Sequence, residues 1–236
     1  MRLVLIACAV IERELRWLAA RCAVEIDARY LEQGLHEQPE RLRQAVQEEI
    51  DRIDAQAAPV DAIVLGYGLC GTGTVGLRSA RHRLVMPRAH DCATLALGCR
   101  QRYRAEFDAE PGTYWCSTGW VEHGALPDDA RLERKGREFA ERFDEDAAAY
   151  LVQVERDALA RYRRCAFVAW PGLSCEPERA AAERAAAERS WRFEALRGDP
   201  GLLADLLAGN WDDRFLVAEP GAAIAASYDE GVVTAP

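Results

Sequence analysis

The sequence lacks three features that would each assign it to a common class of protein. It has no Cys-x-x-Cys pair, which excludes zinc ribbons and knuckles that take cysteines at short spacing. It has no apolar run near the ~20 residues of a transmembrane helix, so we expect no membrane partner. It also has no excess of basic charge, because 30 Lys and Arg stand against 39 Asp and Glu. The resulting net charge of −9 argues against binding to nucleic acid.

The first residues also lack the features of a signal peptide. The apolar run in MRLVLIACAV is short, and Glu12 and Glu14 follow it closely. This pattern predicts a first strand and helix, and hence a cytoplasmic location. In a reducing compartment we expect the eight cysteines to be buried thiols, metal ligands or nucleophiles rather than disulfides.

What the sequence does contain is an alternation of strand-like and helix-like segments. The predicted strands are 2–8, 23–27, 61–65, 82–86, 113–117, 165–170 and 215–218, and the predicted helices are 10–21, 38–56, 128–162, 178–189 and 202–208. This alternation predicts an α/β fold with a layered, mostly parallel, Rossmann-like sheet flanked by helices. Because no linker is evident, we predict a single domain over residues 1–236, with a helical cap or insertion at 128–162.

Three cysteines share one position relative to the predicted strands. Cys8 ends the run RLVLIAC, Cys70 lies five residues after the strand DAIVL, and Cys92 lies six residues after HRLVM. The loops after the carboxyl ends of parallel strands line one crevice, so we expect these thiols to converge as metal ligands. Of the other five cysteines, Cys116 and Cys175 are weaker candidates for this site. We expect Cys22, Cys99 and Cys165 to be packing residues.

The glycine-rich stretch GYGLCGTG raises a competing interpretation. Gly66-x-Gly68-x-x-Gly71 matches a dinucleotide-binding fingerprint. Only ten residues separate Gly71 from the next predicted strand, which leaves room for a turn but hardly for the helix such a site needs. Dinucleotide binding is therefore a minor alternative. We expect these glycines and Gly73 to contact a cofactor, with positive φ angles turning backbone N–H groups toward a thiolate at Cys70.

The stretch MPRAHDC places three polar candidates beside Cys92. His90 could ligate a metal or transfer a proton, and Asp91 could orient its ring. Arg88 could bind a carboxylate or phosphate of a substrate. We therefore expect His90, Asp91 and Arg88 to be catalytic residues, with helix capping as the alternative role of Asp91.

Four stretches together resemble one known family: GYGLCGTGTVGL, MPRAHDCATLALG, YRAEFDAEPGTYWCSTGW and RFEALRGDPGLLADLLAGNWDDRFLVAEPG. They are similar to the DUF1638 family, a domain family of unknown function, and the resemblance covers most of the chain. It implies a motif-bearing role for Cys8, Cys70, Arg88, His90, Asp91, Cys92 and the loop 66–76. It implies no particular activity, and Cys116 and Cys175 lie outside the pattern.

The leading functional hypothesis is a metal-thiolate enzyme. In its first version, Cys8, Cys70 and Cys92 hold a [4Fe–4S] cluster whose fourth iron acts on a small-molecule substrate, with a redox protein as partner. In its second version, zinc takes two or three of these cysteines, with or without His90. That zinc would activate a thiol for methyl transfer, with a methyl carrier as partner.

Two further classes stay open. The first is a metal-free hydrolase with Cys70 or Cys92 as nucleophile and His90 as base. The second is a non-catalytic accessory protein that binds a metal.

Overall fold

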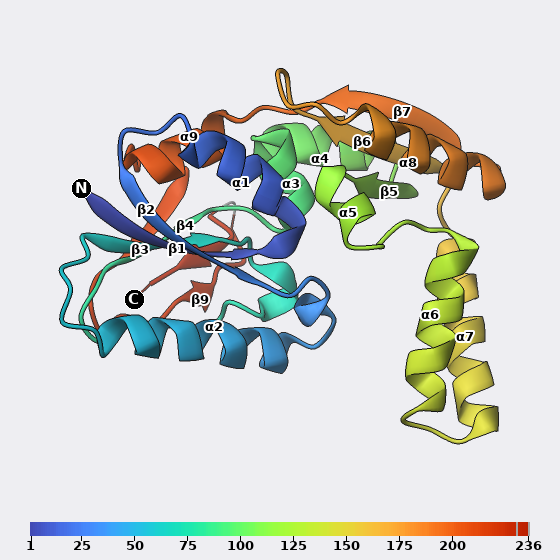
Figure 1. The fold of residues 1–236 in the computed structure, drawn as a ribbon, viewed down its shortest axis with the longest axis horizontal. Helices are drawn as coiled ribbons and strands as arrows, with labels where there is room; N and C mark the ends of the chain where they lie inside the picture. Colours follow the sequence, from blue (N-terminus) through green and yellow to red (C-terminus); the bar gives the residue numbers. More distant parts are fainter. Residues whose placement is uncertain (230, 236) are drawn as a thin grey trace. The chain divides into compact units, whose positions relative to one another are not determined.

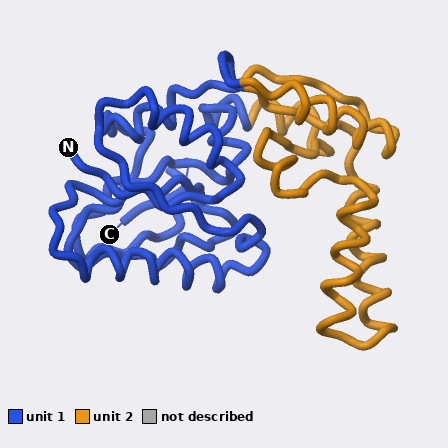
Figure 2. Tube along the Cα trace, in the orientation of Figure 1, with its two compact units in different colours: residues 1–103, 170–173, 198–236 blue, residues 104–169, 174–197 orange. Residues whose placement is uncertain are grey.

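A computed structural model of the chain describes residues 1–229 and 231–235. The chain forms two compact units (Figure 2). Unit 1 consists of Met1–Tyr103, Trp170–Leu173 and Gly198–Pro236, and unit 2 of Arg104–Ala169 and Ser174–Arg197. The chain therefore leaves unit 1 twice and returns to it twice. The single domain expected over residues 1–236 stays a prediction.

Unit 1 contains a five-stranded sheet with the strand order β2-β1-β3-β4-β8 (Figure 1). Its strands are β1 (Arg2–Cys8), β2 (Glu25–Leu31), β3 (Ala62–Gly66), β4 (Leu84–Pro87) and β8 (Phe215–Ala218). The first four run parallel, and β8 pairs antiparallel with β4. The fold is α/β with a mostly parallel, Rossmann-like sheet flanked by helices, which confirms the predicted fold class.

Strand β1 lies inside the sheet, between β2 and β3, where its continuous apolar sequence suits burial on both faces. Leu5 is fully buried and pairs with Ala28 of β2 on one side and with Val64 of β3 on the other. The chain passes from β1 to β2 on one side and then crosses to β3 on the other. In open α/β sheets, ligands bind outside the carboxyl ends of the strands where the strand order reverses in this way. The ends of β1 and β3 therefore mark the expected binding crevice.

The helices of unit 1 follow the strands closely. They are η1 (Ala9–Ile11), α1 (Glu12–Ala19), η2 (Leu35–Glu37), α2 (Pro39–Asp54), η3 (Cys70–Thr72), α3 (Cys92–Leu97) and α9 (Gly201–Ala208), and α4 (Arg100–Ala109) crosses into unit 2. Unit 1 also contains a short antiparallel pair, β9 (Ala225–Ala226) and β10 (Val233–Thr234). Helix α2 buries one apolar stripe, formed by Leu42, Val46, Ile50 and Ile53.

Unit 2 has its own three-stranded parallel sheet, in the order β5-β6-β7. Its elements are β5 (Thr113–Cys116), α5 (Thr118–Glu122), α6 (Asp129–Ala140), α7 (Glu145–Leu159), β6 (Arg164–Ala169), α8 (Glu176–Glu188) and β7 (Arg192–Arg197). The predicted helical stretch 128–162 is the pair α6 and α7, which lie side by side (Figure 1). Its role as a cap stays a prediction. The alanines of α8 bury one face in an apolar core with Phe167 and Trp191.

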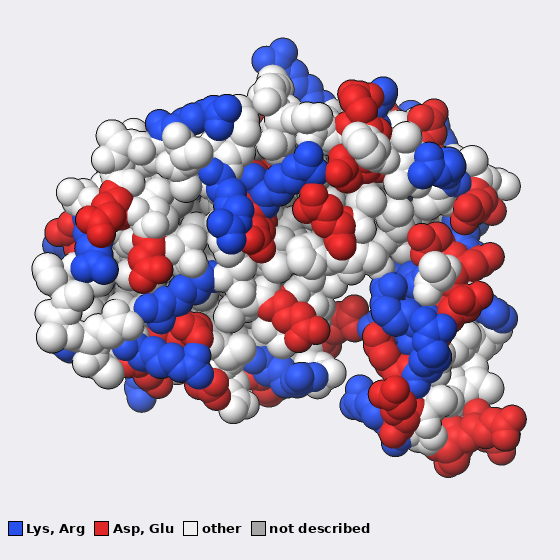
Figure 3. All heavy atoms as spheres, viewed as in Figure 1, with Lys and Arg blue, Asp and Glu red and all other residues white. Residues whose placement is uncertain are grey.

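Charges of both signs are interspersed on the face shown in Figure 3. Many are paired, for example Arg29 with Glu49 at 2.9 Å and Arg131 with Glu155 at 3.0 Å. The displayed face therefore offers no broad basic surface. Among the described residues, no helix combines the length and the apolar character that crossing a membrane requires.

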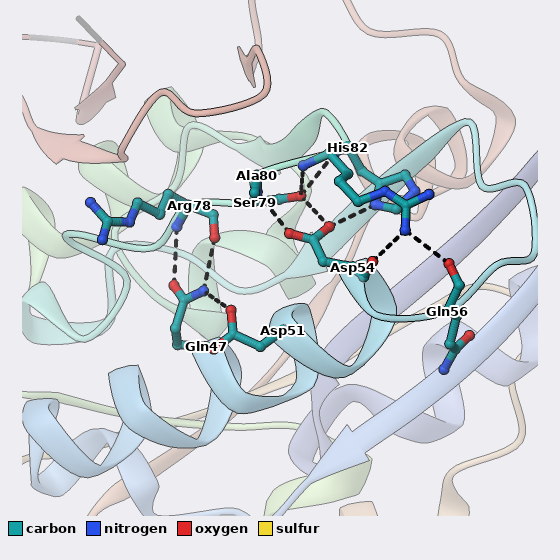
Figure 4. A network of polar contacts seen from close by, with 9 residues as sticks. Gln47, Asp51, Asp54, Gln56, Arg78, Ser79, Ala80 and His82 are labelled. Carbon is teal, nitrogen blue, oxygen red and sulfur yellow. Dashed lines mark hydrogen bonds and ion pairs between the residues drawn. The ribbon is translucent and has the colours of Figure 1, made fainter.

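A polar network around Asp54 ties the end of α2 to the loop before β4 (Figure 4). Asp54 Oδ1 accepts a hydrogen bond from Ser79 Oγ at 2.6 Å and lies 2.8 Å from His82 Nδ1. Its Oδ2 accepts one from the Ala80 N–H at 2.7 Å. Ser79 donates to the carboxylate and not to the imidazole, so this cluster is not arranged as a Ser-His-Asp catalytic triad. We interpret it as a structural tie.

The hydrogen bonds of Asp54 predict that the free energy of unfolding depends on pH. Burial alone would raise the pKa of Asp54, but hydrogen bonds from Ser79, His82 and Ala80 outweigh burial and lower it. A carboxyl group with a lowered pKa in the folded state stabilises the fold above its ordinary pKa of about 4. That contribution is lost as the pH falls through the lower value. We expect Asp54→Asn to lower the free energy of unfolding at pH 7 by about 1–3 kcal/mol.

Urea unfolding at pH 7 and pH 3 measures this effect, with the difference between variant and wild type shrinking at pH 3. Asp51→Asn is the matched control, because Asp51 accepts an exposed hydrogen bond from Gln47 one turn earlier. The control should stay within about 0.5 kcal/mol of the wild type at pH 7. Equal losses in both variants would contradict the prediction.

Candidate functional site

Cys8 is the last residue of β1, and its side chain is 6% exposed. The chain turns there directly into η1, with Val10 two residues further on. The Val10 backbone N–H contributes to lowering the pKa of the Cys8 thiol. The apolar sequence that buries β1 therefore places a thiol at its carboxyl end, with a backbone donor beside it.

Cys70 lies in the connection between β3 and β4. We call its first part, residues 66–76 including the last residue of β3, the glycine arch. All residues between these strands are described, and they form the turn η3 rather than an α-helix, as the short spacing predicts. The φ angles of Cys70, Gly71 and Thr72 are 47°, 64° and 84°. Left-handed angles are costly for the two residues that carry a Cβ, and such strain tends to gather at functional sites. The arch thus holds Cys70 in a constrained backbone.

The arch packs against the loop that precedes Cys92. The N–H groups of Leu69 and Cys70 donate to the carbonyls of Ala89 and His90 at 2.8 and 2.9 Å. Gly68 allows this approach, because a Cβ there would meet the Ala89 carbonyl oxygen at 2.7 Å and a backbone nitrogen at 2.8 Å. Two of the three candidate cysteines are therefore carried by segments that are hydrogen-bonded to each other.

The amides of the arch donate mostly to backbone carbonyls and not to the Cys70 sulfur. Six of them do so, namely those of Leu69, Cys70, Thr72, Gly73, Val75 and Gly76. The glycines instead allow close packing: a Cβ on Gly66 would meet Ala7 Cβ at 2.6 Å, and one on Gly73 would meet Leu42 Cδ2 at 2.5 Å. Gly71 faces open space and has the positive φ. Contact of Gly66, Gly68, Gly71 and Gly73 with a cofactor stays a prediction.

Cys92 is the first residue of α3 and is partly exposed. Asp91 caps this helix, because its Oδ1 accepts hydrogen bonds from the Thr94 N–H at 2.9 Å and from Thr94 Oγ1 at 3.0 Å. The capping alternative for Asp91 is therefore what the structure shows. Its carboxylate is engaged in fixing the helix that carries Cys92, and a catalytic role for it stays a prediction.

The other two polar candidates lie in different surroundings. His90 is exposed at the surface. Arg88 reaches the end of the chain, where its Nε donates to the Phe215 carbonyl at 3.2 Å and its Nη1 to those of Gly231, at 3.1 Å, and Val233. These bonds give Arg88 a structural role in holding the final segment. Substrate binding by Arg88 and catalysis by His90 stay predictions.

The thiols of Cys8, Cys70 and Cys92 lie close enough to shift one another's pKa, and we call them the three-cysteine site. Interactions with the Cys70 and Cys8 thiols, together with burial, raise the pKa of Cys92 well above its ordinary value. The interaction with Cys92 lowers the pKa of Cys8, burial opposes this shift, and the Val10 N–H adds to the lowering. Of these two thiols, Cys8 is therefore the more acidic.

A buried tyrosine adjoins these thiols. The Tyr67 side chain is 2% exposed, and burial followed by the charges of Cys8, Cys92 and Cys70 raises its pKa. In the sequence, the only distinguishing feature of Tyr67 is its place between two glycines. Its proximity to the thiols makes it a candidate functional residue.

The thiols are not already arranged around a single ion. Among the described residues, no group of three or more His, Cys, Asp or Glu side chains could hold a metal ion as placed. Metal binding would therefore require these side chains to change their positions. The role of Cys8, Cys70 and Cys92 as ligands stays a prediction.

The remaining cysteines lie elsewhere. All eight are described, and none forms a disulfide. Cys116, Cys165 and Cys175 belong to the apolar core of unit 2, where the sulfurs of Cys116 and Cys165 lie 3.2 Å apart. The Cys22 sulfur lies 3.5 Å from the Leu207 carbonyl, and the Cys99 sulfur lies 3.2 Å from Gln101 Oε1. Of the three expected packing residues, Cys165 is fully buried, whereas Cys22 and Cys99 are partly exposed.

Comparisons with known proteins identify a family but no activity. No curated protein and no solved structure matches the chain significantly. The model of one family, described as a protein of unknown function (DUF1638), matches residues 30–207. The match includes Cys70, Cys92 and the glycine arch, whereas Cys8 precedes it. Since it covers well over half of the 236 residues, the chain belongs to the DUF1638 family.

Proposed function

We propose that the three-cysteine site binds a metal centre and that the protein is a metal-thiolate enzyme acting on a small molecule. The observation that carries this proposal is the convergence of three sequence-distant thiols outside the ends of β1, β3 and β4. This is where the strand order reverses and where ligands bind in such sheets. Cys8 and Cys70 are buried residues, and burial also raises the pKa of the Cys92 thiol, so the site is shielded from solvent as metal centres often are.

We favour a [4Fe–4S] cluster with three protein ligands. In such a cluster each cysteine binds a different iron, so the sulfurs need not surround one point. A cluster is therefore compatible with three neighbouring thiols that do not surround a single ion. Three cysteines leave the fourth iron open, and an open iron can bind and polarise an oxygen atom of a substrate as a Lewis acid.

Zinc is the alternative metal. Two or three thiolates suit zinc, and a catalytic zinc site keeps one position open for an incoming ligand. In that form the protein would activate a substrate thiol for methyl transfer. The exposed position of His90 gives no particular support to its use as a further zinc ligand.

A metal-free cysteine hydrolase has less support. A nucleophilic cysteine must be deprotonated, and the raised pKa of Cys92 opposes this. The groups that act on the Cys92 thiol are Cys70 and Cys8, together with burial. A non-catalytic protein that delivers a metal would use the same thiols, and it differs from the enzyme in lacking turnover.

Anaerobic purification followed by metal analysis and visible spectroscopy tests the proposal. A brown protein with about four irons and four sulfides per chain supports the cluster. About one zinc per chain without visible absorption supports the alternative. A protein that binds neither metal, even after incubation with Fe²⁺ and sulfide or with Zn²⁺, would contradict both versions.

A further inference from the structure

The hydroxyl group of Tyr67 is buried without a hydrogen-bond partner among the described residues. Tyr67 follows β3 at the start of the glycine arch and is one of the largest fully buried side chains. Buried tyrosine hydroxyls usually have a partner, as Tyr114 does in donating to the Ala125 carbonyl at 2.6 Å. Burying a hydroxyl group without a partner costs free energy, so the unpaired hydroxyl of Tyr67 requires an explanation.

The surroundings of Tyr67 indicate what the missing partner is. The glycines on either side of Tyr67 pack closely against segments next to two of the cysteines: Gly66 lies against Ala7, beside Cys8, and Gly68 against the backbone before Cys92. The three cysteines contribute to raising the pKa of the Tyr67 phenol. A thiol is a weak acceptor, whereas a metal-bound thiolate or a cluster sulfide carries negative charge and accepts hydrogen bonds well. A metal centre between Cys8, Cys70 and Cys92 would therefore supply the acceptor that the hydroxyl lacks.

We propose that Tyr67 Oη donates a hydrogen bond to an anionic sulfur of the metal centre held by Cys8, Cys70 and Cys92. This inference rests on the proposed function and adds a positioning residue to that site. Tyr67 does not bind the metal. It orients and stabilises the ligands, as hydrogen-bond donors around metal sites and iron–sulfur clusters do.

Tyr67→Phe tests this inference, because it removes the donor and keeps the ring. In the metal-free protein we expect the melting temperature to be unchanged or about 2–4 °C higher, since an unpaired polar group is removed. In the loaded protein we expect about 10–100-fold weaker metal binding, as is typical when a supporting hydrogen bond is lost. The measurements are thermal unfolding without metal, and anaerobic retention of iron or of Zn²⁺ against a chelator.

Tyr30→Phe is the matched control. The Tyr30 hydroxyl is also buried without a partner among the described residues, but the charged groups acting on it are Arg16 and Glu12. Its replacement should have the same effect on the metal-free protein and none on metal retention. Comparison of the two variants therefore distinguishes the effect of removing an unpaired hydroxyl from the effect of losing a hydrogen bond to the metal centre.

The possible results distinguish this inference from the proposed function. Metal retention in Tyr67→Phe equal to that in the wild type would overturn the role of Tyr67 and leave the metal site standing. A clear drop in melting temperature of the metal-free variant would also overturn it, because the hydroxyl would then have a partner without metal. A wild-type protein that binds neither iron nor zinc would overturn both.

Discussion

A Cys92→Ser variant is expected to lose its bound metal, with affinity reduced by more than about 100-fold. Loss of a supporting hydrogen bond already weakens metal binding by about 10–100-fold, and loss of a ligand should cost more. Cys92 is the informative position because its thiol interacts with those of both Cys70 and Cys8, as the raised pKa of Cys92 indicates. It is also partly exposed in the first turn of α3, so serine should fit there without disturbing the fold.

Metal content per chain after anaerobic purification measures this loss, and circular dichroism checks that the variant is folded. Cys99→Ser is the matched control, because Cys99 is also partly exposed and follows the same helix. Cys8→Ser and Cys70→Ser should behave like Cys92→Ser. If all three variants keep the metal content of the wild type, the three-cysteine site is not the metal site.

Replacement of Gly68 by alanine should lower the free energy of unfolding by about 2–4 kcal/mol. The added Cβ would lie 2.7 Å from the Ala89 carbonyl oxygen and 2.8 Å from the Asp91 nitrogen. Both are backbone atoms, so relief requires the two segments to separate. Overpacking of this kind costs about 1–3 kcal/mol, and separation also weakens the two hydrogen bonds from Leu69 and Cys70.

Urea unfolding of the metal-free protein measures this change, and Gly71→Ala is the control in the same turn. A Cβ on Gly71 meets nothing within 4 Å, so its only cost is the left-handed φ of 64°, about 1–2 kcal/mol. Gly68→Ala should also weaken metal binding, since it separates the segments that carry Cys70 and Cys92. A smaller loss of stability for Gly68→Ala than for Gly71→Ala would show that close packing is not the role of Gly68.

The strands with strong apolar runs could be predicted from the sequence. β1 and β8 were predicted with their observed bounds, and β3 within one residue at each end, because continuous apolar runs are typical of buried strands. β7 was missed because its sequence, RFEALR, mixes charged and apolar residues at a sheet edge. The antiparallel direction of β8 depends on its pairing with β4, which the local sequence does not encode.

The position of the cysteines could also be predicted, but not their surroundings. The rule that loops at strand ends share a crevice was enough to group Cys8, Cys70 and Cys92. The bonds of Arg88 to the segment near Val233 depend on residues more than a hundred positions away. The unpaired hydroxyl of Tyr67 is likewise a property of three-dimensional packing, because a sequence shows a tyrosine but not whether its partner exists.

The order of the units along the chain has a consequence for synthesis. All three cysteines and Tyr67 lie between residues 8 and 92, before the chain first enters unit 2 at Arg104. The ribosome therefore releases every residue of the three-cysteine site before any part of unit 2. β8, which pairs with the edge of β4, emerges more than a hundred residues after it. The newly made site thus precedes the strand that completes its own sheet, and β4 keeps an open edge during translation of unit 2.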